Sequence, residues 1–120
     1  MRVLLADDAA VARAILARLV ADAGHEVVGE AQDAPTTLER CAALRPDAVV
    51  VDGRLPPDGA LAVVPRLRAL DPALRILVTA GLDDLEFLRA AVAAGASAGL
   101  ERPFLSSKVE AAFALPARTG

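Results

Sequence analysis

Five polar side chains stand at the ends of short apolar runs, and they have the residue types that phosphoryl transfer uses. They are Asp7, Asp8, Asp52, Thr79 and Arg102. Carboxylates with no neighbouring His or Cys suit Mg²⁺, which takes oxygen ligands and keeps several waters. A hydroxyl and a guanidinium suit an anion, and a cation site beside an anion site is what phosphoryl transfer needs. Asp52 is then a candidate nucleophile that would form an acyl phosphate.

Asp52 also has a simpler interpretation. It closes an apolar run, residues 48–51, and Gly53 follows at once, so the side chain could merely end a strand and start a turn. The chemical interpretation requires the other candidates to lie beside it. Three carboxylates gathered at one place would repel one another unless they were protonated or bound to a cation.

Short apolar runs alternate with amphipathic segments along the whole chain. This alternation predicts an α/β fold, a doubly wound five-stranded parallel sheet flanked by five helices. The carboxyl ends of parallel strands meet at one edge of the sheet, so the five polar side chains are expected to gather there. Strands are expected at 2–6, 26–31, 48–52, 75–79 and 97–101. Helices are expected at 10–23, 34–44, 84–94 and 107–115, and a further one, between the third and fourth strands, is expected to end near 70.

The helical spacing also predicts which side chains face the sheet. In the first helix Val11, Ile15 and Leu19, with Val20 as a further candidate, share one face, and Arg13 falls on the other. In the fourth helix the inward residues are expected to be Leu85, Leu88, Ala91 and Val92. Pro65 has no N–H to donate, so the third helix is expected either to begin late, near Ala62, or to kink at Pro65.

Length and composition bound the class of protein. A chain of 120 residues is expected to be a single domain, with 116–120 a possible start of a linker or tail. The net charge of −3, the absence of a basic run and the 2% aromatic content argue against nucleic-acid binding. The first apolar run is too short for a signal peptide or a membrane span, so a cytoplasmic protein without membrane contact is expected.

Four motifs resemble the receiver domain of bacterial two-component response regulators, in order and at similar spacing from Arg2 to about Leu115. They are VLLADD at 3–8, VVVDGRLPPDG at 49–59, ILVTAG at 76–81 and GASAGLERPF at 95–104. The resemblance implies a flavodoxin-like, receiver-type fold. It implies Asp52 as the phosphoacceptor, with Mg²⁺ bound directly by Asp8, Asp52 and the Arg54 backbone carbonyl and through water by Asp7. It also implies that Thr79 and the Ala80 backbone bind the phosphoryl group and that the bond before Pro103 is cis.

The chain departs from this family's pattern at three places. Arg102 stands where the family has Lys, and the planar guanidinium is longer and differently shaped than an ammonium. Gly99 stands where an aromatic residue usually reports phosphorylation by rotating its ring. Asp58-Gly59 comes one residue early, with Pro57 before it, so the loop after Asp52 is expected to have its own shape.

The resemblance predicts a signalling receiver rather than an enzyme. A histidine kinase, a phosphotransfer protein or a small phosphodonor would phosphorylate Asp52, and the domain would then switch its binding to an output domain, a partner protein or a second copy in a homodimer. The alternative is an interaction module that does not depend on phosphorylation, which Gly99 and Arg102 motivate. A phosphatase or mutase is disfavoured because Arg54 stands where those enzymes typically place a second Asp.

Overall fold

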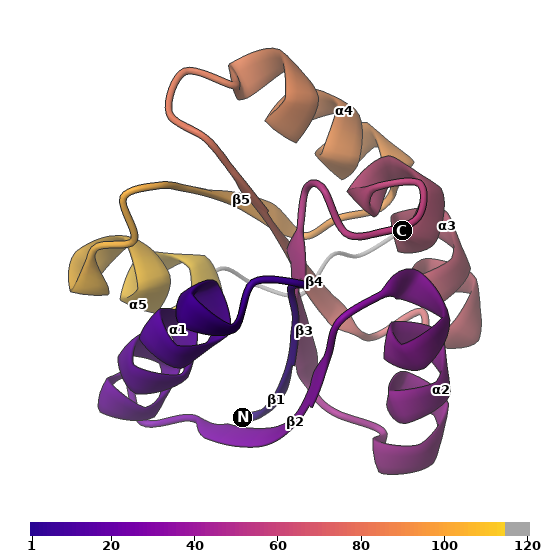
Figure 1. Ribbon diagram of the computed structural model, residues 1–120, viewed down its shortest axis with the longest axis horizontal. Helices are drawn as coiled ribbons and strands as arrows, with labels where there is room; N and C mark the ends of the chain where they lie inside the picture. Colours follow the sequence, from indigo (N-terminus) through magenta and orange to yellow (C-terminus); the bar gives the residue numbers. More distant parts are fainter. Residues whose placement is uncertain (115–120) are drawn as a thin grey trace.

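Residues 1–114 form strands and helices in strict alternation. The computed structural model describes these residues (Figure 1), and the predicted helix end near Leu115 and the possible linker at 116–120 lie outside them. The strands are β1 (Arg2–Ala6), β2 (Glu26–Ala31), β3 (Ala48–Asp52), β4 (Arg75–Ala80) and β5 (Ala98–Glu101). The helices are α1 (Ala10–Asp22), α2 (Ala34–Leu44), α3 (Ala60–Leu70), α4 (Leu85–Ala94) and α5 (Ser106–Ala114).

The five strands form one parallel sheet in the order β2-β1-β3-β4-β5. Every residue of the two strands β3 and β4 is buried, as their continuous apolar sequences predict for strands covered on both faces. The chain runs outward from β1 to β2 and then from β3 to β5, with a helix after each strand. The structure thus confirms the doubly wound α/β fold.

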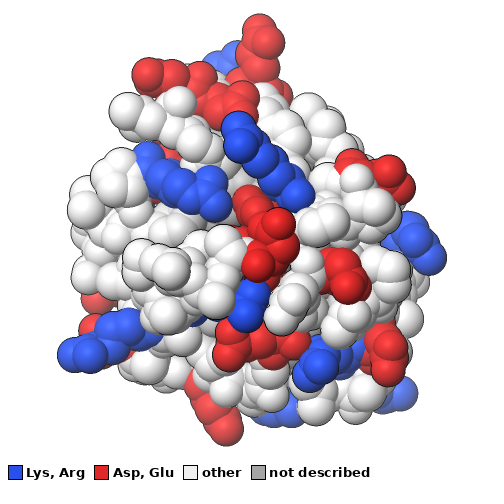
Figure 2. Space-filling model, viewed as in Figure 1, with Lys and Arg blue, Asp and Glu red and all other residues white. Residues whose placement is uncertain are grey.

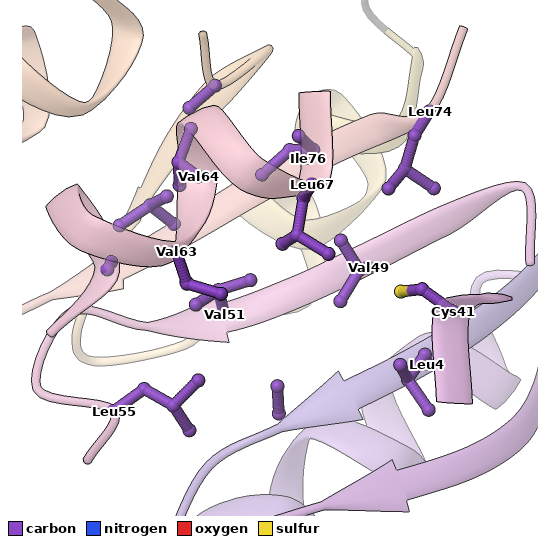
Figure 3. Close-up of a cluster of buried hydrophobic side chains, with 14 of the residues drawn as sticks. Leu4, Cys41, Val49, Val51, Leu55, Val63, Val64, Leu67, Leu74 and Ile76 are labelled. Carbon is purple, nitrogen blue, oxygen red and sulfur yellow. The ribbon is translucent and has the colours of Figure 1, made fainter. Parts of the chain in front are cut away.

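The helices cover the two faces of the sheet through separate apolar clusters. Figure 1 shows α1 and α5 together on one side and α2 and α3 on the other. Figure 3 shows Val63 and Leu67 of α3 reaching the sheet beside Val49 and Val51, which alternate with the residues that face α1 and α5. Because successive strand residues point to opposite faces, one run of Val and Leu residues supplies both clusters.

The register of the sheet sets the geometry of its carboxyl edge. Asp52 is the pairing partner of Thr79, the last residue but one of β4. Ala6 pairs with Val51, and Ala80 pairs with Glu101. Asp7 and Arg102, which follow Ala6 and Glu101 directly, therefore leave the sheet at the same edge as Asp52.

The inward face of α1 agrees with the prediction at Leu19 and Val20 but not at Val11 and Ile15. Val11 and Ile15 are 74% and 48% exposed, and the buried residues of the helix are Leu16 and Val20. The prediction placed Arg13 in solvent, but its guanidinium donates to the Asp7 carbonyl oxygen at 2.6 Å and pairs with Glu30. The inward side of α1 therefore includes Arg13, Leu16 and Val20, and the predicted Leu19 also packs against the core.

Two further details of the helices differ from expectation. The prediction that α3 could begin late was wrong, because its start is fixed at Ala60, whose N–H donates to the Gly53 carbonyl oxygen at 3.0 Å. Pro65 lies inside the helix on its exposed side. In α4, Leu85 and Val92 are 54% and 39% exposed rather than inward.

The residues of α4 that pack against the core on this side of the sheet are Phe87, Leu88, Ala91 and Ala94. The structure confirms Leu88 and Ala91 as inward residues, and the prediction missed Phe87 beside them. Within residues 1–114, no helix has the length and apolar character that a membrane span requires.

Candidate functional site

A pocket of about 820 Å³ opens at the carboxyl edge of the sheet. Its wall includes every residue that the sequence singled out for chemistry except Pro103. Figure 2 shows acidic atoms gathered near the middle of the face in view, with basic side chains directly beside them. The candidate residues in the wall are Asp7, Asp8, Asp52, Arg54, Thr79, Ala80 and Arg102.

Three carboxylates meet in this pocket. Asp7, Asp8 and Asp52 each offer an oxygen, and these oxygens lie within 4.8 Å of one another. Asp7 and Asp52 are buried, whereas Asp8 is exposed. The adjacent positions of Asp7 and Asp8 after β1, and the place of Asp52 beside β1 in the sheet, bring the acids together.

Asp7 is the most constrained of the three acids. Its Oδ1 accepts a hydrogen bond from the Ala9 N–H at 2.8 Å, which fixes the start of the loop before α1. Its Oδ2 is buried and has no hydrogen-bond partner among the described residues. Burial raises the pKa of Asp7, and the negative charges of Asp52 and Asp8 raise it further, against the opposing effects of the Ala9 hydrogen bond and Arg102.

Arg102 is the cation of the pocket. Its Nη2 lies 3.4 Å from Asp52 Oδ1 and 3.9 Å from Asp7 Oδ2, so the guanidinium faces two of the three carboxylates. The side chain is 40% exposed and lies 5.3 Å from the centre of the Phe104 ring. The Arg102 N–H donates to the Ala80 carbonyl oxygen at 2.9 Å, and the bond between Arg102 and Pro103 is cis.

Thr79 supplies a hydroxyl without a partner. The residue is fully buried, and its Oγ1 makes no hydrogen bond within the part of the chain that the structure describes. A buried hydroxyl that is left unpaired costs free energy, so an orphaned one in a polar pocket points to a ligand oxygen. The backbone of Thr79 is fixed by contrast, because its carbonyl oxygen accepts from the Gly53 N–H at 2.9 Å.

The loop after Asp52 is tightly folded. The Leu55 N–H donates to the Asp52 carbonyl oxygen at 3.0 Å, and the Leu55 side chain is fully buried as an anchor. The Pro56–Pro57 bond is also cis, which the sequence analysis did not anticipate. Gly59 has a φ of 83°, a conformation that suits glycine, directly before α3. Arg54, between Asp52 and Leu55, lies in the pocket wall.

Two residues near the site were missed from the sequence. Arg13 binds the Asp7 carbonyl oxygen, and the only hint was that positions 13, 16 and 20 can share one helical face. Phe87 lines the pocket, and a Cβ built on Gly53 would lie only 2.8 Å from its Cε2. The spacing of Phe87, Ala91 and Ala94 is the corresponding signal in α4, since residues four and seven apart share a face.

The donor set fits a hard divalent cation. Three carboxylates with an unused buried oxygen, and no imidazole or thiolate in the pocket wall, favour Mg²⁺ over transition metals. The opposite wall, with the Arg102 guanidinium and the Thr79 hydroxyl, offers donors to an anion. The arrangement can therefore hold a cation and a phosphoryl group side by side.

Fold and pocket together define a flavodoxin-like α/β domain with an acidic site at the carboxyl edge of its sheet. The sequence matches the family described as the response regulator receiver domain over residues 3–114. The chain belongs to this family, which consists of domains of signalling proteins rather than catalytic enzymes.

Individual relatives agree with this assignment. The chain is 32% identical over 108 residues to the chemotaxis protein CheY of Thermotoga maritima, and the match covers 90% of each protein. It is 32% identical to the transcriptional regulatory protein PdtaR of Mycobacterium tuberculosis, covering 95% of this chain and 55% of that protein. Among solved structures, a response regulator of Burkholderia pseudomallei with a phosphorylated aspartic acid, calcium ion and citrate has a TM-score of 0.82 and 30% identity, covering 96% of this chain and 66% of that one.

Proposed function

We propose that this chain is a receiver domain that accepts a phosphoryl group on Asp52 in a Mg²⁺-dependent reaction. The observation that carries the proposal is the composition of one pocket: three carboxylate oxygens within 4.8 Å, an orphaned Thr79 hydroxyl and a guanidinium 3.4 Å from Asp52. The phosphorylated aspartic acid in the relative of Burkholderia pseudomallei supports the same chemistry.

The residues that would hold Mg²⁺ are Asp8, Asp52 and the Arg54 backbone carbonyl, with Asp7 acting through water. The ion would neutralise charge on the incoming phosphoryl group, which carboxylates alone would repel. The unused Oδ2 of Asp7 is available to accept from a bound water. The pairing of Asp52 with Thr79 in the sheet holds the proposed nucleophile in place beside this site.

In the proposed reaction an oxygen of Asp52 attacks phosphorus, and an acyl phosphate bond forms. The bond from phosphorus to the donor breaks, and its electron pair leaves with the donor, which is the imidazole nitrogen of a phosphohistidine or the carboxylate of acetyl phosphate. Arg102 would bind a phosphoryl oxygen and offset its charge. Thr79 would turn its hydroxyl to donate to a second oxygen, and the Ala80 backbone would hold the group in place.

The proposed partners follow from this chemistry. The phosphodonor is a histidine kinase or a phosphotransfer protein, and phosphorylation would switch binding to an output domain, a partner protein or a second copy of the chain. We propose that residues 1–120 act as one receiver unit. The alternative of an interaction module that ignores phosphorylation is not favoured over this function by the pocket, which keeps all three acids and the hydroxyl.

Incubation with acetyl phosphate and Mg²⁺, followed by intact-mass measurement, tests the proposal. We expect one added phosphoryl group on the wild-type chain, none after removal of Mg²⁺ by a chelator, and none on Asp52→Asn. Addition of the same amount of phosphate to Asp52→Asn would show that another residue reacts. Absence of phosphate on the wild-type chain would reject the function itself.

A further inference from the structure

Arg13 of α1 reaches the acids from outside their pocket. Its Nη1 donates to the Asp7 carbonyl oxygen at 2.6 Å, and its Nε pairs with Glu30 Oε1 at 2.7 Å. The side chain is only 13% exposed although it is charged. Arg13 and Glu30 line a separate cavity of about 560 Å³ beside the end of β2. The guanidinium therefore connects α1 and the edge strand β2 to the first residue of the acid pair Asp7-Asp8.

The contact with Asp7 fixes a peptide group rather than a carboxylate. The Asp7 carbonyl carbon is bonded to the Asp8 nitrogen, so a hydrogen bond to this carbonyl oxygen holds the rigid peptide plane that leads into Asp8. The Asp7 N–H is held as well, because it donates to the Ala31 carbonyl oxygen at 3.0 Å. Asp8 itself is exposed, unlike the two buried acids. The direction of its carboxylate therefore depends on the backbone more than on packing.

The start of α1 also depends on these contacts, because it has no capping side chain. Ala9 is the N-cap residue and makes no side-chain capping bond. Instead, the Ala9 N–H donates to Asp7 Oδ1 at 2.8 Å, and the Ala9 carbonyl oxygen accepts from the Arg13 N–H at 3.1 Å. Asp7 and Arg13 thus close a ring of hydrogen bonds around the loop at 7–9. Loss of the guanidinium would open this ring and give Asp8 more freedom.

The charge of Arg13 is balanced outside the acidic pocket. Glu30 lies 2.7 Å from its guanidinium. Burial is the main cause of the raised pKa of Asp7, and the charges that act on this carboxyl are those of Asp52, Arg102 and Asp8. Arg102 faces the carboxylates themselves, whereas Arg13 binds a backbone oxygen. The two arginines therefore differ in what they can do: one offsets the charge of the acids, and the other orients them.

We propose that Arg13 is a positioning residue for the Mg²⁺ site, which holds the Asp8 carboxylate in the direction that the ion requires. It does so by bridging Glu30 and the Asp7 carbonyl oxygen. This inference rests on the proposed function, since it takes the acids around Asp52 as the Mg²⁺ site. Contacts beyond the ligands orient them and change metal affinity without touching the ion. Without Arg13 every ligand would remain, but Mg²⁺ would bind more weakly.

The sign of this effect distinguishes positioning from charge. Removal of a positive charge near the acids would, by charge alone, strengthen Mg²⁺ binding, because a neighbouring cation disfavours a second one. Removal of a residue that orients the acids weakens binding instead. A variant that lacks the Arg13 guanidinium therefore gives opposite results under the two explanations.

Mg²⁺ titration of the full chain, followed by amide chemical shifts, tests the role of Arg13. We expect Arg13→Met, which keeps a long side chain but no donor, to weaken Mg²⁺ binding by about tenfold. Arg13→Lys keeps the charge but cannot span Glu30 and Asp7 together, so it should weaken binding by about threefold. Arg18→Met is the matched control, since Arg18 lies on the same helix, pairs with Asp22 and is 81% exposed. Its Mg²⁺ affinity should equal that of the wild-type chain.

The rate of phosphorylation at different Mg²⁺ concentrations separates positioning from general damage to the fold. With acetyl phosphate as donor, Arg13→Met should need about tenfold more Mg²⁺ for its half-maximal rate of mass gain. At saturating Mg²⁺ its rate should approach that of the wild-type chain, because Asp52, Thr79 and Arg102 are unchanged. A lower rate at saturation, with the same half-maximal Mg²⁺ concentration, would contradict the positioning role.

The outcomes separate the inference from the function beneath it. A wild-type chain that binds Mg²⁺ but takes no phosphate rejects the proposed function, and the titration still decides the role of Arg13. Mg²⁺ binding in Arg13→Met that is as tight as in the wild-type chain, or tighter, overturns the positioning role alone. An equal loss of affinity in Arg18→Met overturns it too. If Arg13→Met does not fold, Arg13→Lys decides, because wild-type affinity in that variant rejects the bridge.

Discussion

Arginines at the two edges of the sheet differ in how closely their guanidinium groups are bound by the rest of the chain. At the amino edge, where β4 and β5 begin, Arg68 donates to the Gly95 carbonyl oxygen through both Nε (3.1 Å) and Nη2 (2.8 Å), and to the carbonyl oxygens of Pro72 and Leu74. At the carboxyl edge, Arg102 is 40% exposed and approaches its two carboxylates only to 3.4 and 3.9 Å.

The difference extends to the neighbouring polar atoms. Near Arg102, Thr79 Oγ1 and Asp7 Oδ2 are buried without hydrogen bonds in residues 1–114. Unpaired buried polar atoms destabilise a fold, so the polar groups of the carboxyl edge lower the stability of the domain, whereas the hydrogen bonds of the amino edge raise it. The polar groups of the amino edge bind one another, and those of the carboxyl edge are left for a ligand. Three substitutions test this contrast.

Arg68→Met should have the largest effect on stability. The carbonyl oxygens of Gly95 and Leu74 would lose their donor, and we expect the free energy of unfolding to fall by about 3 kcal/mol, as for buried acceptors deprived of a charged partner. Urea unfolding measures the loss. Arg66→Met is the matched control on the exposed side of the same helix and should have little effect. Equal losses in the two variants would remove the distinction between the edges.

Asp7→Asn should act in the opposite direction. Without Mg²⁺ the substitution removes one of three clustered negative charges and keeps an oxygen to accept from the Ala9 N–H. We expect the free energy of unfolding at neutral pH to rise by about 1 kcal/mol. With Mg²⁺ the order should reverse, because the wild-type chain keeps the full acid set. Urea unfolding in chelator and in Mg²⁺ gives both values, and a variant less stable than wild type in chelator would contradict the argument.

The pH dependence of this difference follows from the raised pKa of Asp7. The folded chain holds the Asp7 proton more tightly than the unfolded chain, whose ordinary pKa is 3.8. The stability that Asp7 contributes is therefore fully present below pH 3.8 and is lost as the pH rises through the raised value. Wild type and Asp7→Asn should be about equally stable in acid and should diverge above that window.

The sequence predicted the features that depend on residue type and strand order. The alternation of short apolar runs with amphipathic segments was enough to predict a parallel sheet. Because the carboxyl ends of parallel strands meet at one edge, it also predicted that Asp52 and Thr79 lie together. The meeting of Asp7, Asp52 and Arg102 in one pocket followed from topology alone.

The helix faces were not predictable in the same way. Hydrophobic spacing in α1 pointed to Val11 and Ile15, but both are exposed, and Arg13 contacts the Asp7 carbonyl oxygen, a bond that only tertiary structure reveals. In α4 the orientation depends on the empty space over Gly53 and Gly99, which lie far from the helix in sequence. A missing side chain gives no periodic signal.

Arg102→Met should have the smallest effect on stability. It should, however, change the binding of Mg²⁺ and the reaction with a phosphodonor in opposite directions. Arg102 and Mg²⁺ both offset the charge of Asp7 and Asp52, so loss of the guanidinium should tighten Mg²⁺ binding, by up to about fivefold given its exposure to solvent. Phosphorylation by acetyl phosphate should slow instead, because the anion loses its cationic partner. Calorimetric Mg²⁺ titration and the rate of mass gain measure the two effects.

Two further variants locate the cause of this divergence. Arg102→Lys keeps the positive charge and should leave Mg²⁺ affinity near that of wild type, whereas any change in its phosphorylation rate reports the shape of the guanidinium. Arg89→Met removes a charge from the exposed side of α4 and controls for net charge. If Arg102→Met weakened Mg²⁺ binding, Arg102 would be organising the acids rather than competing for them. The polar groups of the carboxyl edge would then serve internal contacts, as those of the amino edge do.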